Sequence, residues 1–253
     1  MRRLALLLML ALLPLICSAQ QKVEVWTYHI SPPFILDDSQ GLSHDFVRLL
    51  NSDPANRGRF KFELTRLTRD RAGLELERKR PGVLLWATPS SFTAAQANNG
   101  RWSRPLLMEQ QVFVSLPDAP FDYEDPQTLH GLILGGVAGQ RYTALNKDIQ
   151  NGKIQRRDVE TDMENFNELM AGRIDTLLIS RSTLLYYLKN AQYKNLYVSD
   201  TPLYRYARHL LVTDALDEAV GSFLADFIEA LPSNPEWQIL LFRYGLNPMA
   251  SAG

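Results

Sequence analysis

The chain has 253 residues, of which 45% are hydrophobic and 22% charged, and its 27 Lys and Arg residues nearly balance 28 Asp and Glu residues. This balance argues against a nucleic-acid-binding protein and against a polybasic membrane anchor. Because Cys17 is the only cysteine, the chain cannot form an internal disulfide.

The first nineteen residues have the pattern of a secretory signal peptide. Two arginines precede an apolar run from Leu4 to Cys17, and small residues lead to an expected cleavage after Ala19. A membrane-spanning helix needs a longer run of about 20 apolar residues. Lipidation of Cys17 is an alternative, although Ile16 stands where lipoprotein processing normally has a small residue. The mature chain of about 234 residues would lack cysteine, so a hydrophobic core must stabilise it.

After this segment the chain alternates strand and helix patterns. Residues Val23 to Leu36 begin with an alternating strand that ends at an aromatic residue, before a short loop and two prolines. Ser43 is expected to cap the first helix. The next elements are a strand, a helix and a strand buried on both faces, over Phe60–Leu64, Thr68–Lys79 and Val83–Ala87. This order predicts a parallel sheet flanked by helices.

A second set of such units begins near residue 131. A strand over Gly131–Val137 leads through a tight loop, Ala138–Arg141, into a helix. The next helix is expected to have a capping box of Thr161 and Glu164 and to end at Gly172. The remaining elements are two strands, a helix that Ser182 starts and two closing helices, with the strands over Ile174–Ile179 and Leu196–Ser199 and the last helix between Ser233 and Gly245.

Two extended segments, Gln111–Leu116 and Tyr204–Thr213, connect the two sets. We therefore expect an α/β protein with two lobes, one formed by residues 20–112 and 206–253 and the other by residues 113–205. Ligands of open α/β sheets bind at the carboxyl ends of the strands. Here these ends would face each other across a cleft that closes by hinge motion.

Several short motifs stand in the order that one protein family has. They are Tyr28 with Pro32-Pro33-Phe34, Gly41, Trp86-Ala87-Thr88-Pro89, Trp102 to Leu106, Leu129-His130-Gly131 with Gly135 to Gly139, Leu169 with Gly172 to Asp175, and Phe242 to Gly245. In these motifs the chain resembles the periplasmic solute-binding proteins of family 3, the amino-acid type.

The resemblance implies a type II periplasmic-binding-protein fold, in which each lobe is a mostly parallel sheet flanked by helices and two crossover segments join the lobes. It also implies a periplasmic monomer that binds a small molecule without a cofactor. Such a protein delivers its ligand to an ABC-type permease or to a membrane sensor.

The chain departs from the resembled family at two positions that recognise amino acids. Family members usually have an arginine for the ligand carboxylate where this chain has Ser91, and a carboxylate for the ligand amine where it has Ser180. A charge-assisted hydrogen bond contributes about 1.5–3 kcal/mol. The departures therefore favour a small polar ligand other than an ordinary α-amino acid.

Six residues of the first set are candidate ligand contacts. Aromatic faces bind flat or cationic groups, and hydroxyl groups after a strand can donate hydrogen bonds. In the alternative interpretation, the tryptophan belongs to the core and the hydroxyl groups cap the next helix. The candidates are Tyr28, Phe34, Trp86, Thr88, Ser90 and Ser91.

The second set contributes five candidates. Gln140, Arg141 and Tyr142 are expected to open a helix, where backbone N–H groups favour an anion. Ser180 and Arg181 follow a strand, and Arg141 and Arg181 together would suit an acidic or phosphorylated ligand. In the alternative interpretation, Arg141 faces solvent, as long charged side chains usually do.

The sequence predicts a binding protein rather than an enzyme. Its four histidines lack metal-ligand spacing, and it has no GxSxG motif or phosphate-binding loop. His44 and Asp45 are adjacent, so a helix would direct them to different faces. We therefore expect no catalytic residues, metal or cofactor. An exported, dehydratase-like enzyme on the same scaffold and an orphan sensor module stay open as alternatives.

Overall fold

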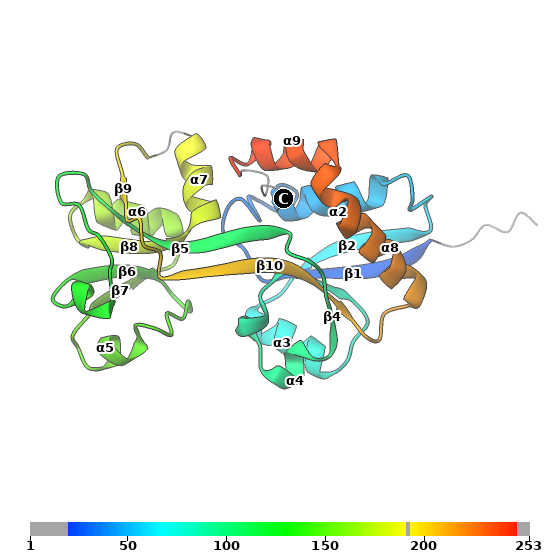
Figure 1. The fold of residues 1–253 in the computed structure, drawn as a ribbon, viewed down its shortest axis with the longest axis horizontal. Helices are drawn as coiled ribbons and strands as arrows, with labels where there is room; N and C mark the ends of the chain where they lie inside the picture. Colours follow the sequence, from blue (N-terminus) through cyan, green and yellow to red (C-terminus); the bar gives the residue numbers. More distant parts are fainter. Residues whose placement is uncertain (1–19, 191–192, 247–253) are drawn as a thin grey trace, which may run out of the picture.

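Two groups of strands and helices lie side by side and are joined by two long strands (Figure 1). The structure is a computed structural model that describes residues 20–190 and 193–246. The predicted signal peptide, with Cys17 and Ala19, lies outside the described residues. No helix among the described residues combines the length and the apolar character that a bilayer crossing requires.

The first half begins with parallel strands. Strand β1 (Gln21–Thr27) pairs in parallel with both β2 (Phe60–Arg66) and β3 (Val83–Ala87). Helices α2 (Leu42–Ser52) and α3 (Arg69–Glu77) connect them. All five side chains of β3 are buried, as expected of a strand with covered faces. The predicted strand–helix order of this half is confirmed.

The second half repeats this plan. Strand β6 (Ile133–Val137) pairs in parallel with β7 (Gln155–Val159) and β8 (Thr176–Ser180). Helix α6 (Asp162–Met170) precedes β8, and helix α7 (Arg181–Lys189) follows it. The shorter elements are a four-residue 3-10 turn η3 (Pro126–Leu129), helix α5 (Asn146–Gln150) and strand β9 (Tyr197–Val198).

Strands β5 (Leu107–Ser115) and β10 (Tyr204–Thr213) cross between the halves. They pair antiparallel through Leu107–Gln111 and Tyr204–Arg208. Beyond this pairing, β10 continues along β3 and β4 (Gly100–Trp102), and β5 continues along β8 and β9. The resulting strand order is β2-β1-β3-β10-β5-β8-β6-β7. The predicted lobe boundaries, after residues 112 and 205, fall within these two strands and stay a prediction.

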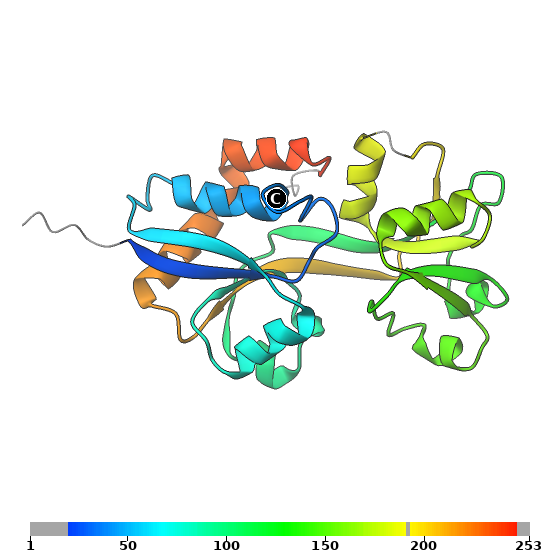
Figure 2. The same cartoon turned by 180° about the vertical axis from the view of Figure 1, so that it is seen from behind.

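Helices cover both faces of the sheet in each half (Figures 1 and 2). In the first half, α2, α8 (Glu218–Ala230) and α9 (Pro235–Arg243) pack over one face, and α3 with α4 (Ala94–Ala97) lies on the other. In the second half, α6 and α7 cover one face and α5 lies on the other. Each half therefore has its own hydrophobic core.

Three predicted caps differ from the structure. The first helix begins after Gly41, whose φ of 126° and close approach to the Phe34 carbonyl leave no room for a side chain, so Ser43 is not the cap. The last helix is capped by Asn234 rather than Ser233, because the Asn234 side chain accepts hydrogen bonds from two backbone N–H groups. Thr161 does cap α6, whereas the Glu164 side chain accepts from the Glu160 N–H, one residue before the cap.

The loop after β6 does not open a helix at Gln140, because α5 begins only at Asn146. The Arg156 guanidinium holds this loop in place. It donates to the carbonyl groups of Val137 and Gln140 at 3.2 and 2.9 Å and lies 4.4 Å from the centre of the Tyr142 ring. The backbone of the loop is thus fixed by a side chain from β7 rather than by helix formation.

The two halves also touch outside the crossing strands. Helices α7 and α9 approach each other at the top of Figure 1. The Lys189 ammonium group of α7 donates to the carbonyl groups of Phe242 and Arg243 at the end of α9 and lies 4.5 Å from the centre of the Phe242 ring. A cation at a helix C-terminus is a favourable pairing.

Candidate functional site

The carboxyl ends of strands from both halves meet at the crossing strands. Strand β3 pairs antiparallel with β10, and β8 pairs antiparallel with β5, so both β3 and β8 end near the pairing of β5 with β10. The chain continues there into Thr88 after β3 and into Arg181 and Ser182 after β8. This placement is the one that open α/β sheets use for ligands.

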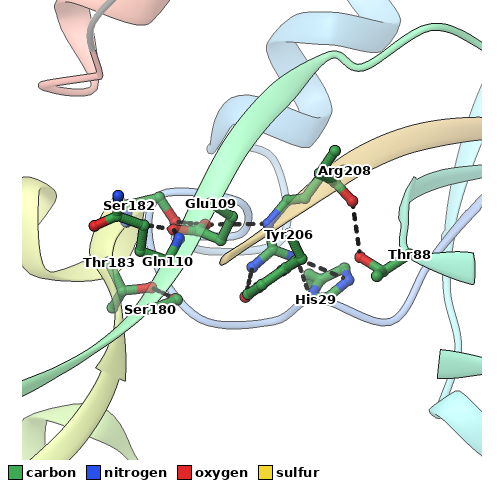
Figure 3. Close-up of polar contacts among 10 residues, drawn as sticks. His29, Thr88, Glu109, Gln110, Ser180, Ser182, Thr183, Tyr206 and Arg208 are labelled. Carbon is green, nitrogen blue, oxygen red and sulfur yellow. Dashed lines mark hydrogen bonds and ion pairs between the residues drawn. The ribbon is translucent and has the colours of Figure 1, made fainter. Parts of the chain in front are cut away.

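A buried ion pair links the two crossing strands. Glu109 of β5 and Arg208 of β10 are only 2% and 3% exposed. The Arg208 Nε lies 3.1 Å from Glu109 Oε2 (Figure 3). Removing two charges from water is costly unless each finds further hydrogen bonds. The surroundings of both side chains provide them.

Glu109 caps helix α7 from outside the helix. The Ser182 N–H donates to Glu109 Oε1 at 3.1 Å, and the Ser182 hydroxyl donates to Oε2 at 2.5 Å. The cap residue Ser180 makes no such bond, since its hydroxyl pairs with that of Thr183 at 2.9 Å. A carboxylate is stabilised at a helix N-terminus by the free N–H groups and the helix dipole. Glu109 therefore couples the crossing strands to the second half.

Arg208 couples the same strands to the first half. Its Nη1 lies 3.0 Å from both ring nitrogens of His29, and its Nη2 donates to the Tyr206 hydroxyl at 3.2 Å. The guanidinium also lies 4.6 Å from the centre of the Phe34 ring. Burial opposes the charge of Arg208, but Tyr206 and Glu109 outweigh it and raise the pKa above its ordinary value.

His29 contributes a neutral imidazole to this network. Burial, together with the positive charges of Arg208 and Arg69, lowers the pKa of His29 well below its ordinary value. A neutral ring has one unprotonated nitrogen, which can accept a hydrogen bond from Arg208. A continuous series of polar contacts thus runs from His29 in the first half, through Arg208 and Glu109, to Ser182 in the second (Figure 3).

The predicted hydroxyl candidates of the first half, Thr88, Ser90 and Ser91, follow the end of β3, as expected. The Thr88 hydroxyl is buried and donates to the carbonyl of Ala207 in β10 at 3.1 Å. Ser90 is exposed and Ser91 half-buried, and both lie in the 3-10 turn η2 (Pro89–Ser91). The Tyr28 hydroxyl is buried beside the Ser91 side chain and the Thr88 backbone, without a well-aligned hydrogen bond among the described residues. Tyr28, Ser90 and Ser91 therefore keep polar groups that a ligand could use.

The other aromatic candidates of the first half are parts of its core. Trp86 has no exposed surface and Phe34 has 1%, and their ring centres lie 5.5 Å apart. The indole N–H of Trp86 donates to the Ser43 hydroxyl at 2.9 Å. Trp86 also has a φ of 61°, beside a register shift in β10, so the strand bends just before Thr88. Trp86 thus shapes the site by directing the strand end.

The candidates of the second half divide between core and surface. Tyr142 is buried, and its hydroxyl donates to the Gln140 side chain at 3.2 Å. Burial raises the pKa of the Tyr142 hydroxyl, so it remains a neutral hydrogen-bond donor. Arg141 and Arg181 are exposed, and neither has a carboxylate partner among the residues that the structure describes. Their positive charges are free for an anion or for solvent.

Asp162, the first residue of α6, places a buried carboxyl group at the border between the halves. Asp162 is 6% exposed, and the Ser31 hydroxyl, in the loop after β1 of the other half, interacts with its carboxyl group. Burial raises the pKa of Asp162, and the Ser31 hydroxyl offsets part of this increase. A buried carboxyl group with a raised pKa is typical of functional sites.

Replacing Asp162 by Asn is expected to stabilise the fold, with a gain that grows from acidic to neutral pH. Because the folded state has a pKa above the ordinary value of 3.8, it holds a proton that the unfolded chain has already released. Stability therefore falls as the pH rises from the unfolded pKa to the folded pKa, and asparagine removes this loss.

Urea unfolding of both proteins at about pH 4 and about pH 7 measures the effect. The exposed Asp118 offers a control, and Asp118→Asn should leave the pH dependence unchanged. A gain from Asp162→Asn that is the same at both pH values would contradict the prediction.

Sequence reasoning missed four charged residues of this region. Glu109, Arg208, Asp162 and Arg69 were not singled out, and His29 entered only as one of four scattered histidines. The sequence did contain one signal, which is a charged residue beside an apolar run in an extended segment. Glu109 follows such a run and Arg208 lies shortly before one. Among the residues that the structure describes, no three His, Cys, Asp or Glu side chains are grouped so that they could hold a metal ion.

The comparisons with known proteins give structural matches only. No protein-family model and no curated protein matches the sequence. A mutant of ArgBP from T. maritima matches with 19% identity and a TM-score of 0.64, over 88% of this chain and 94% of that chain. The GluR0 ligand-binding core from Nostoc punctiforme, in complex with L-glutamate, matches with 16% identity and a TM-score of 0.66, over 88% and 98%.

A third similar structure is the ancestral amino acid-binding protein AncCDT-1, a precursor of cyclohexadienyl dehydratase. It has 17% identity and a TM-score of 0.64, over 88% of this chain and 95% of that chain. At such identities the likeness shows the fold, which is the one implied by the sequence motifs. The chain has the two-lobe α/β fold of the type II periplasmic binding proteins, with two crossing strands between the lobes.

Proposed function

We propose that this protein is a solute-binding protein that closes on a small polar ligand between its two lobes. The observation that carries the proposal is the convergence of polar groups from both halves at the strand ends, on either side of the Glu109–Arg208 pair. The similar solved structures include amino-acid-binding proteins, which supports a binding role. The arginines near the strand ends favour an anionic ligand.

The lobes of this proposal are residues 20–112 with 206–253, and residues 113–205. Tyr28, Ser90 and Ser91 would contact the ligand from the first lobe, and Gln140, Arg141 and Arg181 from the second. Only the closed form lets both lobes contact the ligand, so binding shifts the equilibrium toward closure. The crossing strands β5 and β10 are the segments about which the lobes would rotate.

The proposed location is the periplasm, reached through a cleaved signal peptide, and the proposed state is a monomer. The closed surface would be recognised by an ABC-type permease or by a membrane sensor. An orphan sensor would bind a partner protein without delivering a solute. Pull-down of a membrane kinase or cyclase, without any small-molecule ligand, would favour that role over transport.

A thermal-shift screen of organic acids, amino acids, polyamines and sugar phosphates should yield a stabilising ligand. A ligand at about 100 times its dissociation constant raises the free energy of unfolding by about 2.7 kcal/mol. Arg141→Ala should weaken an anionic ligand relative to the wild type, with Lys147→Ala as a control, because Lys147 is an exposed cation on α5. The proposal fails if no compound of the screen stabilises the protein.

The alternative function is an exported enzyme on the same scaffold. One similar structure is described as a precursor of cyclohexadienyl dehydratase, which supports testing this alternative. Any stabilising compound should therefore be incubated with the protein and followed for product. Turnover that Asp162→Asn abolishes would favour the enzyme, since Asp162 is a buried carboxyl with a raised pKa near the strand ends.

A further inference from the structure

Arg69 directs its side chain toward the residues that follow β3. It is the first residue of α3, and its Nε and Nη2 both donate to the Ser91 carbonyl, with Nε at 3.0 Å. The side chain is half-buried. Ser91 is the position at which the resembled family has a ligand-binding arginine. A guanidinium from a different element thus lies beside the position where the family's arginine is missing.

The charge of Arg69 is not neutralised by a carboxylate among the described residues. Its only hydrogen-bond acceptor there is the Ser91 carbonyl, although a guanidinium has five N–H donors. Arg71, two residues later on α3, pairs instead with Glu75. Glu109, the carboxylate of the network, is already engaged by Arg208 and Ser182. Arg69 therefore keeps donors and a positive charge that an anion could use.

The Tyr28 hydroxyl provides a second unused group in the same place. It is buried and forms no well-aligned hydrogen bond among the described residues, while the Tyr28 ring packs edge-on against Phe92 with ring centres 5.8 Å apart. The hydroxyl lies beside Ser91, whose carbonyl group accepts from Arg69, so Tyr28 and Arg69 share this neighbour. Burial raises the pKa of Tyr28, so the hydroxyl stays protonated and can donate.

We propose that Arg69, together with the Tyr28 hydroxyl, forms an anion subsite that binds a carboxylate or phosphate group of the ligand. The inference rests on the proposed solute-binding function and adds to it the charge of the ligand and the residue that recognises it. In this proposal Arg69, on helix α3, supplies the positive charge for the ligand anion that the uncharged Ser91 cannot supply. A guanidinium can bind a carboxylate or a phosphate through two N–H groups at once.

The probes are succinate and glycerol 3-phosphate, with succinamide and glycerol as their neutral counterparts. Titration calorimetry at low ionic strength should show binding of one anion and of neither neutral compound. Arg69→Gln should weaken that anion about 10- to 100-fold, the range expected for a charge-assisted hydrogen bond. Tyr28→Phe should weaken it less, because it removes one neutral donor. Binding of succinate would identify a carboxylate subsite, and binding of glycerol 3-phosphate would identify a phosphate subsite.

Arg78→Gln is the matched control. Arg78 lies at the other end of α3, is exposed, and gives the same change in net charge. Its replacement should leave the affinity unchanged, while thermal unfolding checks that both variants fold. Arg69→Lys retains the positive charge but loses the two parallel N–H donors of the guanidinium. Its affinity for the anion should therefore lie between those of the wild type and Arg69→Gln.

The subsite is refuted if Arg69→Gln binds the anion as tightly as Arg78→Gln does. It is also refuted if neither anion binds at concentrations up to about 10 mM, which corresponds to a binding free energy weaker than about −3 kcal/mol. The proposed function is judged separately. A neutral solute that stabilises the wild type and Arg69→Gln equally would retain solute binding and eliminate the anion subsite.

Discussion

Replacing Glu109 by Ala is expected to lower the free energy of unfolding by about 3–5 kcal/mol, the usual cost of removing one partner from a buried ion pair. The variant leaves the guanidinium of Arg208 buried without its carboxylate. It also removes the acceptor of the Ser182 N–H and hydroxyl groups at the start of α7. The loss should therefore exceed that from either interaction alone.

Urea unfolding, followed by fluorescence, measures the change through the transition midpoint and slope. Glu63→Ala is the control, because Glu63 forms surface ion pairs with Lys22 and Lys61 and should have little effect. The double replacement Glu109→Gln with Arg208→Met should recover much of the loss, since no unpaired charge then stays buried. A Glu109→Ala variant as stable as Glu63→Ala would contradict the assignment.

Replacing Trp86 by Ala is also expected to cost about 3–5 kcal/mol, as large-to-small changes of aromatic core residues do. Trp86 has no exposed surface, stacks on Trp237 with ring centres 6.3 Å apart, and meets the edge of Phe46 at 5.3 Å. Its removal would leave a cavity between β3 and helices α2 and α9. The bend of β3 just before Thr88 would no longer be fixed by the packing of the Trp86 side chain.

The same unfolding measurement, applied to two milder variants, separates the contributions. Ser43→Ala leaves the buried indole N–H without an acceptor and should cost about 1–3 kcal/mol. Trp86→Phe keeps part of the packing and should fall between Ser43→Ala and Trp86→Ala. If Trp86→Phe changed ligand affinity strongly while leaving stability unchanged, Trp86 would be a wall of the binding site rather than a core residue.

Several elements of this protein follow from local rules. Strand β3 matches its predicted range, Val83–Ala87, because a short apolar run bounded by Pro81-Gly82 leaves few alternatives. The range of β10 also matches, and Gly172 ends α6 with a φ of 66°. Hydrophobic period, caps and glycine positions act over a few residues, so they can be read from the chain alone.

The predicted helix starts were wrong where a residue distant in the sequence contacts the backbone at the predicted start. Helix α2 begins after Gly41, where the Phe34 carbonyl lies against the backbone, and Arg156 from β7 fixes the loop that was expected to open a helix at Gln140. In both cases the decisive neighbour lies several residues or an entire strand away. Local sequence preferences contain no information about such a neighbour.

By itself, the sequence determined the alternation of strands and helices, the two connecting segments and hence the two-lobe α/β architecture, because these depend on period and order. Only the tertiary structure decided which polar and charged groups meet. Glu109 and Arg208 are 99 residues apart and meet only once β5 and β10 are in register. Arg69 and Ser91 are 22 residues apart and meet only once α3 lies against the turn that follows β3. Electrostatic pairing depends on distance in space, which the order of residues along a chain does not specify.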